Sequence, residues 1–481
     1  MKKQLGFKCV LVISAGTLLW SFYGCSGTPD TRTAMPVEVP EAFSSAGTIA
    51  LPDKWWQSFE DPALDILVEE GLKQNFSIRS TWDRLRQAEQ VAAKAGASLL
   101  PSVTYEGAAV RTRRDTNDNI SYSTAYTVGV AASYEVDLWG RVRSTQQAAA
   151  LDAIAAREDV ASAAITLSAA IAKTWYQLVE AWLQEKLVAR QVETNEQVLA
   201  IITLQFRQGQ VGAANIFRQR QLVESTRGQL INYQETAALL QHQLAILIGK
   251  TPGNWKPEVS DFLLTVSELP DTGVPSELLQ RRPDLRSAQN AIAAADYRVS
   301  SAIADQYPRI GLSASAETNA ARVRDLFDDW LASVAASAVG PVFDAGLRRA
   351  EVERTRAVLS ERINTYAQKM LTAIGEVENA IQQEYYQRQS IANLQQQLVL
   401  AGQVSERTRE SYLKGQVDYI RVLDALVSRQ TLERNELSAR RVLIDYRIDL
   451  CRSIAGGWEL TQPKPATLQS EHQLTMRSLH E

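Results

Sequence analysis

The chain has 481 residues, of which 45% are hydrophobic, and a formal net charge of −4. A slightly acidic balance, without lysine-rich or arginine-rich blocks, argues against a nucleic-acid partner. Three cysteines and three histidines leave little material for a disulfide framework, a cysteine-rich zinc site or a histidine-based hydrolase. We therefore expect a fold held together by packing, with no cofactor and no bound metal.

The first 24 residues have the pattern of an export signal. A basic start, MKKQLGFK, precedes an apolar stretch at 9–24 that is short and directly followed by polar sequence, unlike a spanning helix. Cys25 comes next and opens a small, polar tether. This junction resembles the lipoprotein signal of bacteria, in which the cysteine is acylated, although Phe22 and Tyr23 depart from the usual motif. The alternative is an ordinary signal peptide with an incidental cysteine.

Two β-hairpins are predicted, at 102–137 and 309–341. In 121–137 apolar and tyrosine side chains alternate with small and polar ones, and 309–317 repeats the alternation. This pattern is typical of outer-membrane strands with lipid on one face and water on the other, although a soluble sandwich would explain any single strand. Four strands are too few to close a wall in lipid. Several copies must then assemble: two would give eight strands and three would give twelve.

A long helix is predicted after each hairpin. Residues 141–206 contain neither proline nor glycine, and residues 347–412 contain no proline. Each stretch would be roughly 100 Å long as an α-helix, a length typical of coiled coils. The predicted helices of the two halves are short helices at 61–99 and 284–306, long helices at 141–208 and 347–413, and returning helices at 213–248 and 418–454.

The chain is a tandem duplication with an offset of 206 or 207 residues. FRQGQV at 206–211 returns as YLKGQV at 412–417, and Gly140 of DLWGRVR corresponds to Gly346 of FDAGLRR. The predicted organisation is a signal peptide at 1–24, a lipid-anchored extension at 25–60, a first repeat at 61–250, an equatorial linker at 251–283, a second repeat at 284–455 and an equatorial tail at 456–481.

The sequence resembles the TolC-like outer-membrane factor family, particularly its efflux lipoprotein branch, which serves resistance-nodulation-division pumps. The resemblance is carried by WWQSFEDPALDILVEEGLKQNFSIR (55–79), DLWGRVR (137–143), the segment 281–315 that begins RRPDL, GPVFDAG (340–346) and KGQVDYIRVLDA (414–425). It implies a mixed, mainly α fold that forms a homotrimer. In such a trimer a twelve-stranded outer-membrane β-barrel continues into a periplasmic α-barrel of coiled-coil hairpins.

The resemblance also implies a function. Members of this family are passive, gated outer-membrane channels without catalytic activity, and most of each chain lies in the periplasm. They dock onto a periplasmic adaptor (membrane fusion) protein and an inner-membrane resistance-nodulation-division transporter, and they export drugs, metal ions or other small toxic solutes. Two alternatives are the exit duct of a type I protein secretion system and a lipid-anchored coiled-coil stalk that transports nothing.

A periplasmic gate is expected at Asp418, Arg421 and Asp424. In the family, acidic side chains after the second hairpin turn narrow the channel; Asp424 matches the deeper acidic position, whereas Arg421 replaces the other acid. Carboxylates that converge in a trimer would have raised pKa values or attract cations. Arg421 could pair with Asp424 within or between chains. The alternative is a solvated i,i+3 pair on an exposed helix.

The two hexapeptides are expected to form the tip that contacts the adaptor. Each glycine would end a long helix, where a left-handed C-cap requires glycine; capping alone is the alternative role. The first turn continues GAANIFRQ, without an acid matching Asp424, so the two hairpins are not expected to gate equally. The expected tip residues are Gly209, Gln210, Val211, Gly415, Gln416 and Val417.

Overall fold

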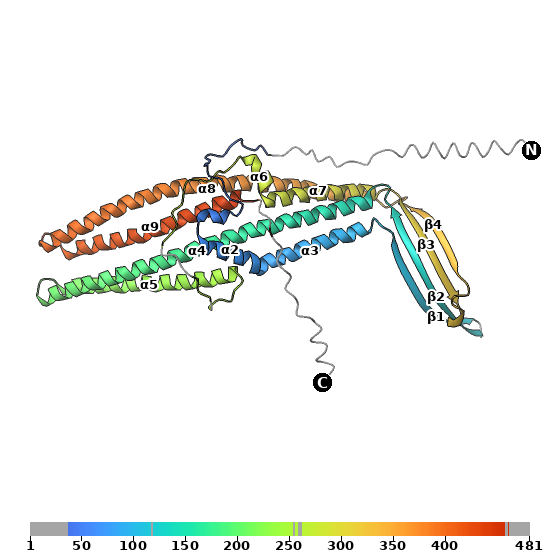
Figure 1. Ribbon diagram of the computed structural model, residues 1–481, viewed down its shortest axis with the longest axis horizontal. Coiled ribbons are helices and arrows are strands. Elements are labelled where there is room, and N and C mark those ends of the chain that lie inside the picture. The colour runs from blue at the N-terminus through green and yellow to red at the C-terminus, as the bar shows by residue number, and fades with distance from the viewer. Residues whose placement is uncertain (1–36, 117–118, 254, 258–261, 457–459, 461–481) are drawn as a thin grey trace, which may run out of the picture. The chain divides into compact units, whose positions relative to one another are not determined.

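The structure is a computed structural model, and it describes residues 37–116, 119–253, 255–257, 262–456 and 460 (Figure 1). The predicted signal peptide, the predicted lipidation site Cys25 and most of the predicted tail lie outside the described residues. Among the helices in the described ranges, none is both long enough and apolar enough to cross a membrane.

The described chain forms two compact units, each built from both repeats. The first, here called the strand unit, contains Arg86–Ala155 and Ala288–Tyr366. The second, here called the helical unit, contains Val37–Leu85, Ala156–Ser287 and the chain from Ala367 onward. The tandem duplication is therefore visible inside each unit, rather than dividing the chain into two separate domains.

One four-stranded antiparallel sheet, in the order β1-β2-β3-β4, dominates the strand unit. Its register places the apolar side chains on one face, because Tyr105 lies opposite Val130, and Val130 lies opposite Ala316. Along β2 and β3 the intervening residues on the other face are small or polar, whereas β1 and β4 also place Val110, Leu331 and Val339 there. The predicted alternation is confirmed. The strands are β1 (Ser102–Thr116), β2 (Asn119–Val136), β3 (Arg309–Ala320) and β4 (Leu331–Val339).

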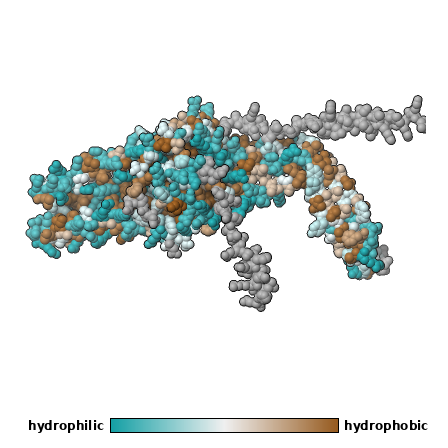
Figure 2. Space-filling view, viewed as in Figure 1, coloured by the Kyte–Doolittle hydropathy of each residue, from teal (hydrophilic) through white to brown (hydrophobic). Residues whose placement is uncertain are grey.

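The apolar face of the sheet is uncovered in the single chain. The Tyr105 side chain is 90% exposed and Val334 is 87% exposed, and apolar side chains are spread over the sheet in the space-filling view (Figure 2). In the described residues β1 pairs only with β2, and β4 pairs only with β3. Both outer strands therefore leave a row of backbone hydrogen-bonding groups open.

The helices occur where they were expected, with two differences. The predicted helix at 61–99 is two helices, because Asn75 interrupts it and its side-chain oxygen accepts from the amides of Ser77 (2.8 Å) and Ile78 (3.2 Å). The predicted linker at 251–283 contains a short helix that begins with a proline. The helices are α2 (Pro62–Gln74), α3 (Phe76–Ala97), α4 (Arg141–Arg207), α5 (Ala213–Leu247), α6 (Pro275–Arg281), α7 (Pro283–Ala304), α8 (Leu347–Leu413) and α9 (Tyr419–Ile454).

The core of the helical unit surrounds the middle of α4. Trp55 and Trp56, in the 3-10 turn η2 (Trp55–Phe59), are fully buried with Trp175 of α4. The Trp55 indole donates to Ser168 Oγ (3.1 Å), and the Trp175 indole donates to the Asp61 carboxylate (2.8 Å). Because the indole N–H groups of Trp55 and Trp175 have acceptors, these two side chains bury their rings without losing a hydrogen bond.

Candidate functional site

The two hexapeptides form the same turn. Gly209 and Gly415 have positive φ angles of 74° and 71°. Each glycine amide donates to the carbonyl three residues earlier (2.9 Å), and the following amides, of Gln210 and Gln416, donate to the carbonyl five residues earlier (2.9 Å). This is the Schellman motif, which satisfies the last carbonyls of a helix and requires a left-handed residue. The repeated sequence therefore reflects a repeated backbone requirement.

Both turns expose their glutamines and partly bury their valines. Gln210 and Gln416 are exposed, and Val211 and Val417 are half-buried. Apart from each glycine's own chain neighbours, no described residue lies within 4 Å of the position where a side chain would grow from either glycine. The turns therefore present open surfaces, which fits the predicted docking role as well as capping.

An apolar cluster joins the two hairpins just behind the turns. Ile202 of α4, Ile216 of α5 and Tyr419 of α9 are all buried there, and Val211 and Tyr412 pack against them. Both hairpin ends belong to the helical unit, and of the predicted tip residues Val211 packs against this cluster. The ends of the two helical hairpins together with this cluster are called the tip.

Two tyrosines strengthen this junction. Tyr412 donates from its hydroxyl to Gln205 Oε1 (2.8 Å), and Tyr419 donates to Gln219 Oε1 (2.5 Å). The two rings meet edge to face, with centroids 5.8 Å apart. Burial, with a smaller contribution from Tyr412, raises the pKa of Tyr419 far above its ordinary value. Tyr419 therefore keeps its proton and remains a hydrogen-bond donor.

A chain of buried amides continues behind the tyrosines. Gln219 Nε2 donates to the Asn195 carbonyl (2.7 Å), and the Asn195 side chain donates to Thr226 Oγ1 (2.9 Å) and accepts from Gln430 Nε2 (2.9 Å). Because an unpaired buried polar group is costly, this network fixes the register of α4, α5 and α9. Sequence reasoning missed these residues; the available signal was amide side chains at the apolar positions of long helices.

Two of the three predicted gate residues, Arg421 and Asp424, lie on one exposed face of α9. Arg421 and Asp424 are three residues apart, and Ser428 continues the same face four residues later. Asp418 is the N-cap residue of α9, but its side chain makes no capping hydrogen bond. Within the described chain no ion pair joins Arg421 to Asp424, so the pairing considered within one chain is not formed. Pairing between chains stays a prediction.

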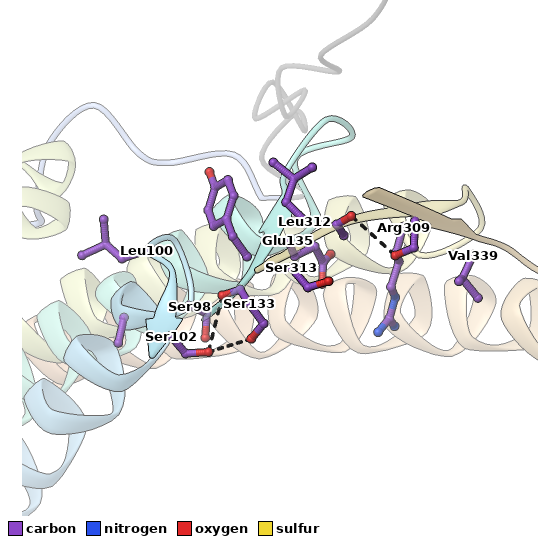
Figure 3. A pocket seen from close by; sticks show the side chains of 13 residues that line it. Ser98, Leu100, Ser102, Ser133, Glu135, Arg309, Leu312, Ser313 and Val339 are labelled. Atoms are coloured by element: carbon purple, nitrogen blue, oxygen red, sulfur yellow. Dashed lines mark hydrogen bonds between the residues drawn. The ribbon is translucent and has the colours of Figure 1, made fainter. Parts of the chain in front are cut away.

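The strand unit contains a shallow, open hollow on the polar face of the sheet (Figure 3). Ser102 Oγ lies 2.8 Å from Ser133 Oγ at its edge, and Ser313 and Arg309 also line it. These side chains can bind water but form no enclosed ligand cavity. Among the described residues there is also no group of three or more metal-ligating side chains.

Comparison with known proteins identifies the family. Residues 67–250 and 274–456 match the family described as outer membrane efflux protein, and these two ranges nearly coincide with the two predicted repeats. The chain belongs to this outer membrane efflux protein family. It is accordingly a protein of the outer membrane, with a large periplasmic helical part, and it acts as an efflux channel.

Relatives of this outer membrane efflux protein are similar over almost their whole length. The pyoverdine export outer membrane protein OpmQ of Pseudomonas aeruginosa is 29% identical over 473 residues, which cover 95% of this chain and 98% of OpmQ. The cation efflux system protein CusC of Escherichia coli O6:H1 is 26% identical, covering 91% and 96% of the two chains. The solved structure of the outer-membrane channel OprN has a TM-score of 0.84 and 26% identity, covering 91% and 100%.

Proposed function

We propose that this efflux protein is the outer-membrane component of a tripartite efflux system, a passive and gated duct that exports small toxic solutes. One observation carries the proposal. The same chain contains a sheet with one apolar and one polar face and two helical hairpins that end in the same kind of turn. A plain stalk needs the helices but not the two-faced sheet. Relatives named for the export of pyoverdine and of cations support efflux of small solutes.

The duct requires more than one copy of the chain. An open sheet edge is not tolerated in hydrocarbon, and known membrane barrels begin at about eight strands. We propose a homotrimer, in which three sheets give twelve strands and place the apolar faces toward lipid. The hollow of Figure 3 would then face the water-filled interior, where its serines are hydrated.

The periplasmic partners would be an adaptor protein and an inner-membrane resistance-nodulation-division transporter. The exposed glutamines at Gln210 and Gln416 offer amide donors and acceptors at the end of each hairpin, which is the surface that an adaptor would meet. Cys25 is proposed as the lipid anchor, which would hold the trimer to the inner leaflet of the outer membrane.

The gate would be the ring of three Asp424 side chains that assembly brings together. Asp424 is exposed and unpaired in the described chain, so its carboxylate is available to line a pore. Charged rings of this kind determine which ions enter a channel. Opening would have to move the hairpins apart behind the ring, against the buried cluster and the tyrosine hydrogen bonds of the tip.

Single-channel conductance in planar bilayers tests the duct and its gate. The wild type is expected to conduct weakly, and Asp424→Ala is expected to raise the conductance because it removes charge from the narrowest point. Asp329→Ala is the matched control, since it removes an exposed carboxylate from a loop of the strand unit. Protein that inserts but never conducts in any form would favour the stalk.

The secretion alternative needs a separate comparison. Cells that lack the chain would be complemented with it and assayed both for survival on dyes and antibiotics and for secretion of an unfolded polypeptide. Efflux predicts that survival is restored without secretion. Restored secretion without a change in survival would favour the type I duct instead.

A further inference from the structure

We infer that the tip of this duct is electropositive and selects for small anionic solutes, because Arg218 of the first repeat stands where Asp424 stands in the second and Arg421 adds another cation. The inference rests on the proposed duct and names its substrate class.

Arg218 and Asp424 are equivalent positions of the duplication. Each is the ninth residue after its turn glycine and the sixth residue of its returning helix, α5 or α9. Each is exposed, and each is followed by a buried residue, Gln219 or Ala425. The two side chains therefore occupy the same face of the two returning helices, at the same distance from the turn.

The tip places these two helices at the same level. The hydroxyl of Tyr419, the first residue of α9, bonds to Gln219, the residue next to Arg218. Ile216 of α5 also packs in the same cluster as Tyr419. In a trimer the returning helices of the two repeats alternate around the axis, so three arginines and three aspartates would share one ring. The ring at this position is then mixed rather than acidic.

The neighbouring charges make the tip positive. The equivalent windows 205–222 and 411–428 contain five basic side chains against two carboxylates, although the whole chain carries a net charge of −4. All five basic side chains are exposed, and within the described residues none of them forms an ion pair. The two carboxylates are Asp418 and Asp424, and the five basic residues are Arg207, Arg218, Arg220, Lys414 and Arg421.

This charge pattern has a direct consequence for transport. Charges of one sign around an aqueous constriction concentrate the opposite ion and repel like ions. Guanidinium groups also bind carboxylates and phosphates in a bidentate geometry. A solute that carries such groups would enter the tip more easily than a metal cation. The carboxylates of Asp424 would then weaken the binding of an anion to the arginines of the ring, so that the anion passes instead of staying bound.

The test is the reversal potential of the reconstituted wild-type trimer under a KCl gradient. We expect chloride to permeate better than potassium at about 0.1 M salt, and the preference to fade near 1 M, where the Debye length falls from about 10 Å to about 3 Å. The double variant Arg218→Asp, Arg421→Asp is expected to invert the preference. Asp424→Asn is expected to shift it further toward anions.

Arg362→Asp is the matched control, because Arg362 is an exposed arginine of α8 in the strand unit, far along the helix from the tip. It should leave the reversal potential unchanged, and a detergent-resistant trimer band should verify the assembly of every variant. Conduction with a cation preference in the wild type, or a double variant identical to the wild type, would overturn the inference and leave the duct intact. Inserted protein without any conductance would overturn both.

Discussion

In each repeat the residue before the short helix donates a hydrogen bond to the end of the returning helix, a contact called the joint. The two repeats use different side chains for it. Asn75 precedes α3 and Arg282 precedes α7, at equivalent positions of the duplication. The Asn75 amide donates to the carbonyl of Leu247 at the end of α5 (2.9 Å), and the Arg282 guanidinium donates to the carbonyl of Ser453 near the end of α9 (3.3 Å). The acceptors are themselves equivalent, since Leu247 and Ser453 are 206 residues apart.

The two side chains also differ in what else they contact. Phe76 begins α3 with ordinary amides, so the joint needs an N-cap, and Asn75 supplies it. Pro283 begins α7 and has no amide hydrogen, which removes one unsatisfied donor of its first turn, and Arg282 has no side-chain acceptor with which to cap the remaining amides. Arg282 instead reaches the carboxylates of Asp284 (2.8 Å) and Glu376 (2.7 Å). The backbone acceptor is thus equivalent in the two repeats, whereas the side-chain donor and its other partners differ.

The largest expected loss of stability comes from a substitution at the charged joint of Arg282. Arg282→Met leaves Asp284 and Glu376 without their guanidinium in a mostly buried site, which should cost about 2–3 kcal/mol. Hydrogen exchange of the first turn of α7 measures the local opening. Arg281→Met removes a neighbouring arginine whose side chain is 54% exposed, and it should change little. Equal effects of the two substitutions would show that Arg282 has no special role.

Substitution of Asn75 at the neutral joint should lower the stability less than substitution of Arg282 does. Asn75→Ala removes both the cap and the bond to the Leu247 carbonyl, with an expected loss of about 1–2 kcal/mol. Asn75→Asp keeps the capping oxygen but places an acceptor against the Leu247 carbonyl, so it should destabilise the joint while the cap is retained. Faster exchange at Ser77 and Ile78 in the alanine variant alone would separate the two contributions. Equal acceleration of exchange at Ser77 and Ile78 in both variants would contradict this assignment.

The turns provide a comparison in which the repeats should not differ. Gly209→Ala and Gly415→Ala each place a side chain on a left-handed residue with open space around it, so only the backbone angle is penalised, by about 1 kcal/mol each. Exchange of the last turns of α4 and α8 should accelerate by similar factors. A much larger effect in one repeat would reveal a contact that the shared geometry does not require.

The smallest expected effect is a pH dependence at the charged joint. Burial alone would raise the pKa of Asp284, but the hydrogen bonds and charge of Arg282 and the Leu285 amide together hold it below its ordinary value. The stability from this pairing is therefore complete above the unfolded pKa of about 4 and is lost as the pH falls through the lower folded value. Asp284→Asn should remove the acid-dependent part of α7 opening; an unchanged profile would assign it to another carboxylate.

Local signals made much of this molecule predictable. Proline-free stretches, alternating strands and turn glycines predict the long helices, the hairpins and their ends, because each depends on residues close together in the chain. Asn75, the tyrosines of the tip and Arg282 were missed because their roles depend on partners far away in sequence, such as Gln219 and Ser453. The exposure of Asp424 on α9 could be predicted from the helical spacing, but its proposed role in a pore depends on other chains.

The open edges of β1 and β4 have a consequence for biogenesis. A single chain cannot enter the bilayer core without exposing backbone amides and carbonyls to hydrocarbon. Insertion therefore requires association with other copies of the chain. The rate of insertion should then rise more steeply than linearly with the concentration of chains. Before they associate, newly exported subunits would be aggregation-prone intermediates in the periplasm, where chaperones and proteases compete for them.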